Sequence, residues 1–352
     1  MNRTLPGQIA RVCILPALLL VPALLTGQRP YPCVDSPKIF LYPDFAGQVY
    51  VVPDNLCFSN GPGIEVQADG VTIDLAGKTL FCSGSPLGCQ GNSLAVGIDV
   101  GSHKNVTIKD TIGLGRIEGF HTGILVDKGD RVRIESLTIT GTHANFDAFR
   151  GDATGILVKD VACPGAILID GNDVSWHRYG IRLLNSSCVK IQRNIVHHNN
   201  NNGGEAYGIL LSGLSDPPSV MFGSSGNTIT NNTLTYNGFH NTYGSSGEID
   251  AGLVLDGRDT TGNRVSQNTV LSNCGDGIMT RQSASGNTVS NNTVHDNPTQ
   301  SNGPEQSCSW PSPTQLRNYD LASRGAGENR WSKTNDCGVS FGILPGVCIV
   351  SK

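Results

Sequence analysis

The sequence is poor in charged residues, aromatic rings and methionine. Of its 352 residues, 15% are charged, 6% are aromatic and 3 are methionine, and the formal net charge is −4. It contains no run of basic residues, so no nucleic-acid partner is expected. Such a low charge also argues against helical bundles, whereas the 44 glycines favour many short strands joined by tight turns.

Long apolar runs are missing after the first 27 residues. Arg3 and Arg11 flank the start of an apolar segment at 12–25, which is too short for a comfortable membrane span and is followed by Thr-Gly-Gln. We therefore expect a signal peptide at 1–27, a secreted or periplasmic (cell-envelope) location, and no transmembrane segment in the mature chain. An uncleaved N-terminal anchor is the alternative.

The cysteines lack the spacing of metal sites. None of the ten cysteines after the expected signal peptide forms a C-x-x-C pair. An even number in an exported chain suggests disulfide bonds, although the sequence leaves their pairing open. Our pairing hypotheses are Cys33–Cys57, Cys82–Cys89 and Cys163–Cys188, of which the last would join adjacent repeats.

A short repeat dominates what is present. A glycine followed by an alternating apolar tetrapeptide pattern recurs eight times, with a shortest spacing of 25 residues. These starts lie at 63, 97, 123, 155, 180, 208, 252 and 277. A second apolar pair in later repeats encloses an asparagine at positions 172, 194, 232, 268 and 292. A further asparagine follows at positions 199, 237, 273 and 297.

Three short strands per repeat predict an all-β solenoid, a right-handed parallel β-helix of about eight or more coils. Equal offsets then become vertical columns, because successive coils stack at ~4.8 Å. We expect apolar columns inside and asparagine columns at a sharp corner, with left-handed backbone angles and amide hydrogen bonds between coils. A β-sandwich with chance repeats is the alternative.

The domain boundaries follow from the repeat. We expect an N-terminal cap at 28–62, the β-helix at 63–297, and a C-terminal extension at 298–352 that packs on the helix, because a solenoid must cover its open ends.

Two segments carry a family resemblance. The stretch from VTIDLAGKTL (71–80) to GRIEGFHTGI (115–124) and the ending ENRWSKTNDCGVSFGILPGVC (328–348) resemble secreted parallel-β-helix-repeat proteins of bacteria, including the NosD-like group. That superfamily includes pectate lyases, polygalacturonases, alginate epimerases and phage tailspike glycosidases. The resemblance therefore implies the fold and leaves the activity open. The Asp-Pro-His motif of alginate epimerases and the paired Asp-Asp motif of polygalacturonases are missing.

Polysaccharide-acting relatives bind substrate along the sheet that begins at the Gly-Ile starts, which here is flanked by the long loops 142–154 and 238–251. Its first outward column is apolar from Leu125 onward, except for Arg182. An apolar stripe on an exterior face predicts a cover, either a loop, the C-terminal extension or a protein partner. Scattered apolar surface residues are the alternative.

The second outward column carries charge and suggests chemistry. Lys159 or Arg281 could take a proton beside a uronate carboxyl group, and Asp127 or Asp256 could bind Ca²⁺ or act as acid and base. Surface charges that keep the face soluble are the alternative. The polar and aromatic clusters at 146–152, 175–180 and 244–252 supply further candidates.

From these patterns we select two sets of candidates. The catalytic candidates are Asp147, Arg150, Lys159, His177, Arg178 and Glu248. The substrate-binding candidates are Asp127, Trp176, Tyr179, Arg182, Asp250, Asp256 and Arg281. No metal ligand set is predicted, and Ca²⁺ is the single cofactor considered.

The leading hypothesis is a monomeric, exported β-helix protein that binds or processes an extracellular polysaccharide. As an enzyme it would be a lyase, an epimerase or a glycosidase. The competing hypothesis is a non-catalytic surface or envelope scaffold, adhesin-like, that presents its loops or its apolar face to a protein.

Overall fold

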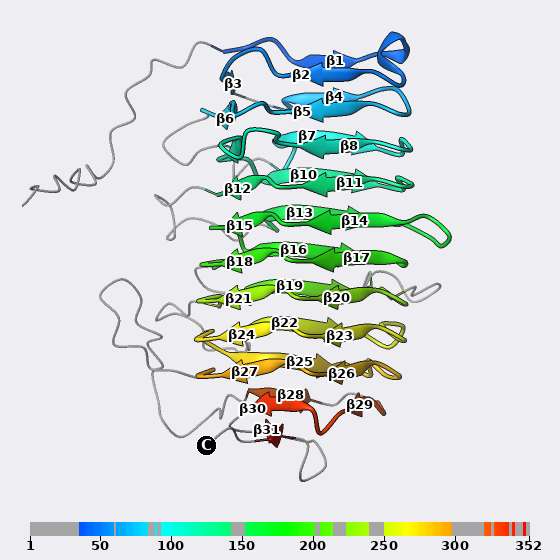
Figure 1. Cartoon of the computed structure of the whole chain (residues 1–352), viewed down its shortest axis with the longest axis vertical. Coiled ribbons are helices and arrows are strands. Elements are labelled where there is room, and N and C mark those ends of the chain that lie inside the picture. The colour runs from blue at the N-terminus through cyan, green and yellow to red at the C-terminus, as the bar shows by residue number, and fades with distance from the viewer. Residues whose placement is uncertain are drawn as a thin grey trace, which may run out of the picture. The chain divides into compact units, whose positions relative to one another are not determined.

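The computed structural model describes most of the chain from residue 35 onward. The described residues are 35–59, 61–83, 89, 93–141, 152–200, 205–213, 223–238, 250–297, 320–324, 327–337, 340–341 and 348–349. Their strands fall into three sheets, named A, B and C in the order in which the chain visits them. Figure 1 shows the coils stacked one below another, each passing through the three sheets in turn.

The strand bounds are as follows. Sheet A contains β1 (Ile39–Leu41), β4 (Ile64–Val66), β7 (Val96–Gly101), β10 (Thr122–Asp127), β13 (Thr154–Lys159), β16 (Tyr179–Leu184), β19 (Tyr207–Ser212), β22 (Ala251–Asp256), β25 (Asp276–Arg281), β28 (Leu321–Arg324) and β31 (Ser340–Phe341). Sheet B contains β2 (Val49–Val51), β5 (Thr72–Asp74), β8 (Thr107–Lys109), β11 (Arg133–Glu135), β14 (Ile167–Asp170), β17 (Val189–Gln192), β20 (Thr228–Thr230), β23 (Arg264–Ser266), β26 (Thr288–Ser290) and β29 (Arg330–Trp331). Sheet C contains β3 (Leu56–Phe58), β6 (Thr79–Cys82), β9 (Arg116–Glu118), β12 (Thr138–Thr140), β15 (Asp173–Ser175), β18 (Ile195–His197), β21 (Thr233–Thr235), β24 (Thr269–Leu271), β27 (Thr293–His295), β30 (Asn335–Cys337) and β32 (Cys348–Ile349). A 3-10 turn, η1 (Pro43–Phe45), lies between β1 and β2.

The pairing confirms the fold predicted from the sequence. Neighbouring strands are parallel, and Ile134 of β11, for example, pairs with Ile108 of the coil before and Ile169 of the coil after. The chain is a right-handed parallel β-helix, with 11, 10 and 11 strands in the three sheets of the described residues. Strands from 39–58 and from 321–349, the segments expected to be cap and extension, join the same sheets.

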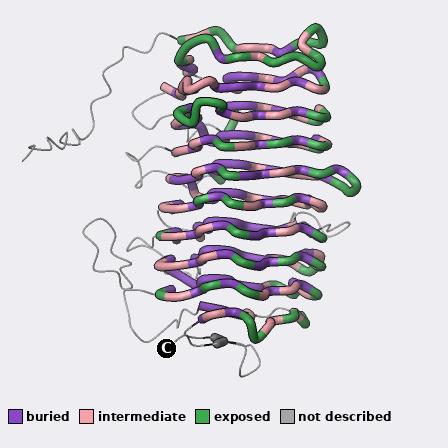
Figure 2. The backbone as a smooth tube through the Cα atoms, viewed as in Figure 1, coloured by how far each residue is buried: buried purple, intermediate pink, exposed green. Residues whose placement is uncertain are grey.

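The core is a narrow column of aliphatic side chains. Inward positions of sheet B from Ile73 to Val289 are at most 1% exposed, and the inward positions of sheets A and C in the middle coils have no exposed surface. Figure 2 shows buried segments recurring at the same place in successive coils of the middle of the helix. β-branched residues suit these positions because their side chains pack well on a pleated surface.

The glycine of each Gly-Ile start has a steric cause. A Cβ atom at Gly180 would lie 2.4 Å from Val196 Cγ1 and 2.6 Å from the carbonyl oxygen of Gly208 in the next coil. The glycine therefore lets the entrance of sheet A approach the adjacent coil, which no larger residue would allow.

Asparagines form hydrogen-bonded ladders between coils, as predicted. At the corner between sheets B and C, the backbone N–H and the side-chain amide of Asn194 both donate to Asn232 Oδ1, at 3.0 and 2.9 Å. Asn232 donates in the same way to Asn268. A second ladder at the corner between sheets C and A runs through Asn199, Asn237, Asn273 and Asn297.

The prediction of left-handed backbone angles at these asparagines is wrong by one residue. Positive φ angles belong to the residue before each ladder asparagine, for example 55° at Arg193 and 56° at Asn231. The ladder asparagines are at most 1% exposed, so their side chains point inward. Asparagine is used because one buried amide can both accept from one coil and donate to another.

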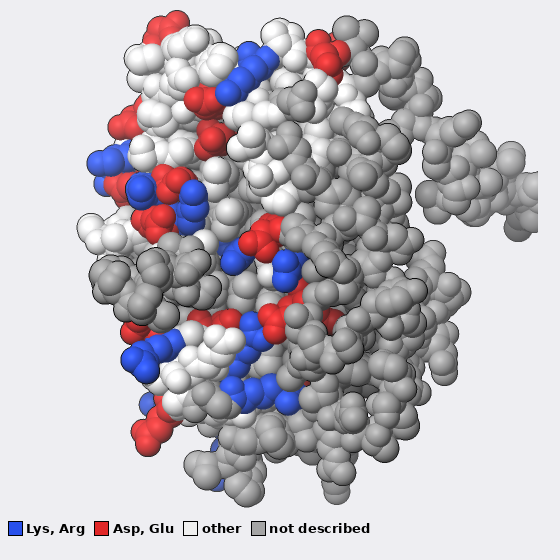
Figure 3. All heavy atoms as spheres, turned by 180° about the vertical axis from the view of Figure 1, so that it is seen from behind, with Lys and Arg blue, Asp and Glu red and all other residues white. Residues whose placement is uncertain are grey.

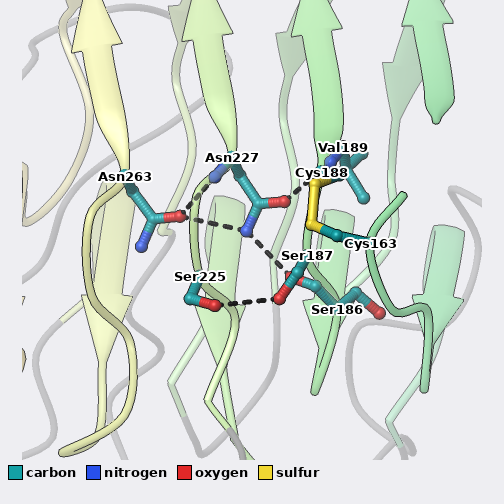
Figure 4. The surroundings of a disulfide bond; sticks show 8 residues. All are labelled: Cys163, Ser186, Ser187, Cys188, Val189, Ser225, Asn227 and Asn263. Carbon is teal, nitrogen blue, oxygen red and sulfur yellow. Dashed lines mark hydrogen bonds between the residues drawn. A yellow bond between two sulfur atoms is a disulfide. The ribbon is translucent and has the colours of Figure 1, made fainter. Parts of the chain in front are cut away.

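A third ladder, not foreseen from the sequence, lies at the corner between sheets A and B. It joins Asn227, Asn263, Asn287 and Asn329. Figure 4 shows its first members beside a disulfide bond. A glycine with positive φ precedes three of them, at 226, 262 and 286, which explains the recurring Gly-Asn pairs.

Two of the three disulfide hypotheses are confirmed. Cys82 bonds to Cys89, and Cys163 bonds to Cys188 across adjacent coils (Figure 4). Cys57 is also in a disulfide bond, while Cys33 lies outside the described residues.

The expected signal peptide at 1–27 lies outside the described residues as well. In the part of the chain that the structure describes, no helix has the length and hydropathy of a membrane span.

Candidate functional site

The outward columns of sheet A follow the predicted register. In the first column Leu125 pairs with Leu157, which pairs with Arg182. In the second column Asp127 pairs with Lys159, and three coils later Asp256 pairs with Arg281. Figure 3 shows one side of the molecule, on which acidic and basic side chains alternate without a large region of one sign.

A third outward column was not foreseen. It consists of the residues directly before the Gly-Ile starts, among them Thr154, Tyr179, Tyr207, Ala251 and Asp276, which the strand pairing aligns. The sequence could have indicated this column, because its members are the residues that directly precede the repeated glycines. This column brings two tyrosines into adjacent coils of the candidate face.

The two tyrosines are stacked between arginines. The ring centroids of Tyr179 and Tyr207 are 5.8 Å apart with an interplanar angle of 23°. The Arg182 guanidinium lies 4.8 Å from the Tyr179 ring, and that of Arg281 lies 5.5 Å from the Tyr207 ring. Such cation–π contacts hold both arginines against the sheet.

Arg281 connects two carboxylates on this face. Its guanidinium donates to both carboxylate oxygens of Glu205, with an Nη2–Oε2 distance of 2.8 Å, and the same Nη2 donates to Asp256 Oδ2 at 2.9 Å. Because both carboxylates contact one nitrogen, they lie within a few ångströms of each other. Glu205, which the sequence analysis missed, precedes β19 by two residues.

The environments of these carboxylates move their pKa values in opposite directions. Burial raises the pKa of Asp256 above its ordinary value, although the charge of Arg281 opposes the shift. Burial also acts to raise the pKa of Glu205, but the hydrogen bond and charge of Arg281 outweigh it, and the net pKa is lowered. Such a divergence is characteristic of paired acid and base groups.

Buried polar atoms without a partner gather beside this pair. Among the described residues, Asp256 Oδ1, Arg281 Nε and Ser212 Oγ lack a hydrogen-bond partner. Ser212 is 7% exposed and ends β19, the neighbour of the strand that ends with Asp256. Buried groups of this kind normally have partners, so water or ligand atoms are expected there.

The remaining outward candidates are held in ion pairs. Lys159 Nζ lies 2.9 Å from Asp127 Oδ2. Arg178 and Arg182 both contact Asp152, at 3.0 and 3.3 Å.

The candidates of the segment 175–180 do not point in one direction. His177 is 2% exposed and lies at the start of the ladder between sheets C and A, where its backbone N–H donates to Asn199 Oδ1 at 3.1 Å. Burial lowers the pKa of His177 to about 3, so its ring is neutral. Trp176 instead stacks on His198, with ring centroids 5.0 Å apart.

Asp250 is buried as well, and its carboxylate accepts a hydrogen bond from the Ala206 backbone N–H at 2.7 Å. Asp147, Arg150 and Glu248 lie outside the described residues. The structure therefore brings together Tyr179, Arg182, Asp256 and Arg281 on one face. It leaves Lys159 three coils before Asp256, and His177 inside the helix.

The apolar stripe of the first column is buried in its second half. Leu210 is 4% exposed, and Val254 and Met279 have no exposed surface. They pack with the two tyrosines in an apolar cluster outside the helix core. The expected cover is therefore provided within the chain over these coils.

No group of three or more His, Cys, Asp or Glu side chains among the described residues is placed to hold a metal ion. The carboxylates of the candidate face instead contact cationic side chains.

Comparisons with known proteins agree with the fold. A family model described as "Right handed beta helix region" matches residues 95–303. None of the curated proteins matches the sequence.

Solved structures add distant likenesses. The Dettilon tailspike protein is 15% identical with a TM-score of 0.50, and the match covers 86% of this chain and 62% of the tailspike chain. The periplasmic alginate epimerase AlgG is 12% identical with a TM-score of 0.49, covering 81% of this chain and 60% of that one. The pectate lyase Pel9A is 15% identical with a TM-score of 0.45, covering 89% and 72%. The chain thus spans about three fifths of the first two proteins. At 15% identity the likeness to the tailspike protein shows the fold alone.

Proposed function

The chain belongs to the right-handed β-helix family, and on that basis we propose that it is an exported protein that binds an extracellular polysaccharide on the outer face of sheet A. The binding site is centred on Arg281, Glu205 and Asp256, with Tyr207 and Tyr179 beside them. Export is supported by the disulfide bonds, which form in oxidising compartments.

One observation carries this proposal. The partnerless polar atoms of Asp256, Arg281 and Ser212 lie on the same face as two stacked tyrosines. Sugar hydroxyl groups supply both donors and acceptors for such atoms, and the buried tyrosines pack beneath the arginines that carry them. The sequence resemblance to polysaccharide-acting proteins points to the same class of ligand.

The paired carboxylates support a reaction as well as binding. Asp256, with its raised pKa, is suited to protonate a leaving oxygen, and ionised Glu205 is suited to act as base or nucleophile. Retaining glycosidases place two carboxyl groups roughly 5 Å apart, and carboxylates that share one guanidinium nitrogen lie in that range. We propose glycoside cleavage as the activity of this site.

A non-catalytic scaffold is the second candidate, and the burial of Val254 and Met279 favours it. A covered face leaves less room for substrate, and every arginine described above is in an ion pair.

Binding to a glycan array, followed by a product assay on the polymers bound, separates these possibilities. We expect binding by the wild-type chain, and loss of turnover with retained binding in Asp256→Asn and Glu205→Gln. Asp69→Asn, which changes an exposed carboxylate paired with His103, is the matched control. Turnover that survives both substitutions would exclude the pair as acid and base. A failure to bind any glycan would favour the scaffold.

If the pair is catalytic, its pH dependence follows from the two pKa shifts. Activity requires Asp256 protonated and Glu205 ionised, so it should fall above the raised pKa of Asp256 and below the lowered pKa of Glu205. The kcat/KM profile of the wild-type enzyme should therefore be bell-shaped with an acidic optimum. A profile that rises steadily through neutral pH would contradict this assignment.

A further inference from the structure

The charges on the outer face of sheet A are compensated in pairs. Six cationic side chains lie on described strands of this sheet or directly before them, and each contacts a carboxylate. The pairs are Lys38–Glu65, Lys159–Asp127, Arg178–Asp152, Arg182–Asp152, Arg281–Glu205 with Asp256, and Arg324–Asp276. The charge of every cation in this set is therefore already compensated by a carboxylate of the chain.

The tightest pairs lie at the centre of the proposed binding site and in the coil next to it. Glu205 occupies the guanidinium of Arg281 through two hydrogen bonds, and Asp276, which has no exposed surface, occupies that of Arg324 through two more, at 2.7 and 3.0 Å. A ligand carboxylate would have to displace one of these groups from a partly buried position. The displaced carboxylate would lose its partner beside other negative charges, which is costly.

Asp99, which has no ion pair among the described residues, adds to this repulsion. Asp99 lies in the first outward column, next to Glu65 in the strand pairing. Its carboxylate accepts a hydrogen bond from the Gly101 backbone N–H at 2.9 Å. A polymer with a carboxylate on every residue would meet like charge at this end of the column, and like charges placed together reject a ligand.

From this charge pattern we infer that the glycan bound on the outer face of sheet A is uncharged in its repeating unit. The inference rests on the proposed function and narrows it. Partnerless atoms of Ser212, Asp256 and Arg281 match the hydroxyl groups that neutral sugars present.

The ligand class also selects the reaction. Elimination and epimerisation remove a proton from the carbon that carries the carboxyl group of a uronate, and a neutral sugar has no such acidified proton. Hydrolysis needs no carboxyl group. The bond between C1 and the glycosidic oxygen breaks, and the leaving oxygen takes its proton from Asp256. Water supplies a hydroxyl group to C1, and its remaining proton goes to the Asp256 carboxylate, which is thereby restored. Of the three reactions considered for this chain, hydrolysis is thus the one that fits.

The test compares polymers that differ in charge alone. Homogalacturonan and alginate are used in native form and after chemical reduction of their carboxyl groups to alcohols, alongside neutral galactan and dextran. Wild-type affinity is measured by calorimetry in about 0.05 and 0.5 M NaCl, which changes the screening of charge strongly. We expect neutral polymers to bind about tenfold or more tighter than native polyuronates, with an affinity that does not change with salt.

A variant that removes one carboxylate from these ion pairs tests directly whether the pairing excludes charged polymers. Asp152→Asn removes the shared carboxylate of Arg178 and Arg182 and should raise the affinity for native homogalacturonan several-fold in low salt. Asp69→Asn, the matched control, should leave it unchanged. Asp152 is 62% exposed, so its substitution should not impair folding.

The outcomes separate the two proposals. Preferential binding of native polyuronates by the wild-type chain, weakened by salt, overturns the neutral-glycan inference and leaves the proposed function standing. An Asp152→Asn variant that gains no affinity for polyuronate also counts against the inference. Failure to bind every polymer of this panel and of the glycan array overturns the proposed function itself.

Discussion

At the scale of single residues, the ladder asparagines explain why this polar sequence forms a stable interior. Asn232 accepts from the backbone and side-chain amides of Asn194, and donates to the carbonyl oxygens of Ile191 and Thr230. Its own backbone N–H and amide also donate to Asn268. One buried side chain thus satisfies polar groups of three successive coils, which no apolar residue could do.

Replacing Asn232 by alanine should therefore be costly. The substitution removes the acceptor for the buried N–H of Asn194, and we expect a loss of about 2–4 kcal/mol in the free energy of unfolding. Denaturant titration measures it. Asn231→Gly is the matched control, because Asn231 is exposed with a φ of 56° and glycine adopts that angle freely, so its effect should stay within about 0.5 kcal/mol. Equal losses in the two variants would contradict the ladder as the source of stability.

His177 makes a different prediction, because it stands in a ladder position without being an amide. Its pKa is about 3 in the folded chain and near 6.5 when exposed, so only the unfolded chain gains a proton as the pH falls below about 6.5. Stability should therefore decline on acidification between about pH 6.5 and 3, by up to ~1.4 kcal/mol per pH unit.

His177→Asn restores the residue type of the ladder and should remove this part of the pH dependence. Thermal unfolding of both chains between pH 7 and 4 checks it. His103→Asn replaces a partly exposed histidine, and in this control variant the decline of stability on acidification that His177 causes should remain. If stability declines with falling pH as steeply in His177→Asn as in the wild-type chain, His177 is not the group that titrates.

Residue types were easier to predict than the directions of side chains. The segment 175–180 reads as one polar-aromatic cluster. In the structure, however, a positive φ of 62° at Trp176 turns the chain, so that His177 points inward and Tyr179 reaches the face of sheet A. Glu205 was missed because it lies before a strand and not on an outward position of the repeat. Corner geometry decides these directions, and the periodicity of the strands does not encode it.

At the scale of elements, the repeat made the strands and outward columns of sheet A predictable. Paired apolar positions and the Gly-Ile starts define all three strands of a coil, and the observed register of Leu125, Leu157 and Arg182 follows directly. The corners vary more, because inserts change the spacing between ladder neighbours from 22 residues at Asn172–Asn194 to 38 at Asn194–Asn232. Loop conformations at these inserts lack a periodic signal, so the sequence could not place the residues they carry.

The Cys163–Cys188 bond ties one such corner to the next coil. It closes a sequence separation of 25 residues, and restriction of the unfolded chain by a loop of this length contributes roughly 3.5 kcal/mol. The double variant Cys163→Ser/Cys188→Ser should lose about this much free energy of unfolding. The matched variant Cys82→Ser/Cys89→Ser opens a separation of only 7 residues and should lose about 1 kcal/mol less. Equal stability of the first variant and the wild-type chain would exclude a role for this bond in holding the corner.

At the scale of the whole molecule, stability comes from contacts between adjacent coils. Each strand except those at the ends of the sheets pairs with the coil before and the coil after it, and the ladders repeat the same contacts at all three corners. In such a solenoid each unit is stabilised by its two neighbours, so the number of coils matters less than their registry. This also explains how inserts of different length are tolerated between coils without loss of the fold.

Deletion of one complete coil should therefore preserve the fold, whereas deletion of half a coil should not. Asn268 and Asn292 occupy equivalent ladder positions 24 residues apart, so removal of 269–292 joins Asn268 to Thr293 with every column still aligned. We expect a folded, less stable protein with an unchanged β-sheet circular dichroism per residue. Because Arg281 is lost, it should no longer bind glycan. Removal of 269–280 joins the end of sheet B to the end of sheet A and should give an unfolded or aggregated chain. If both deletions fold equally well, alignment of columns between coils is not what holds this molecule together.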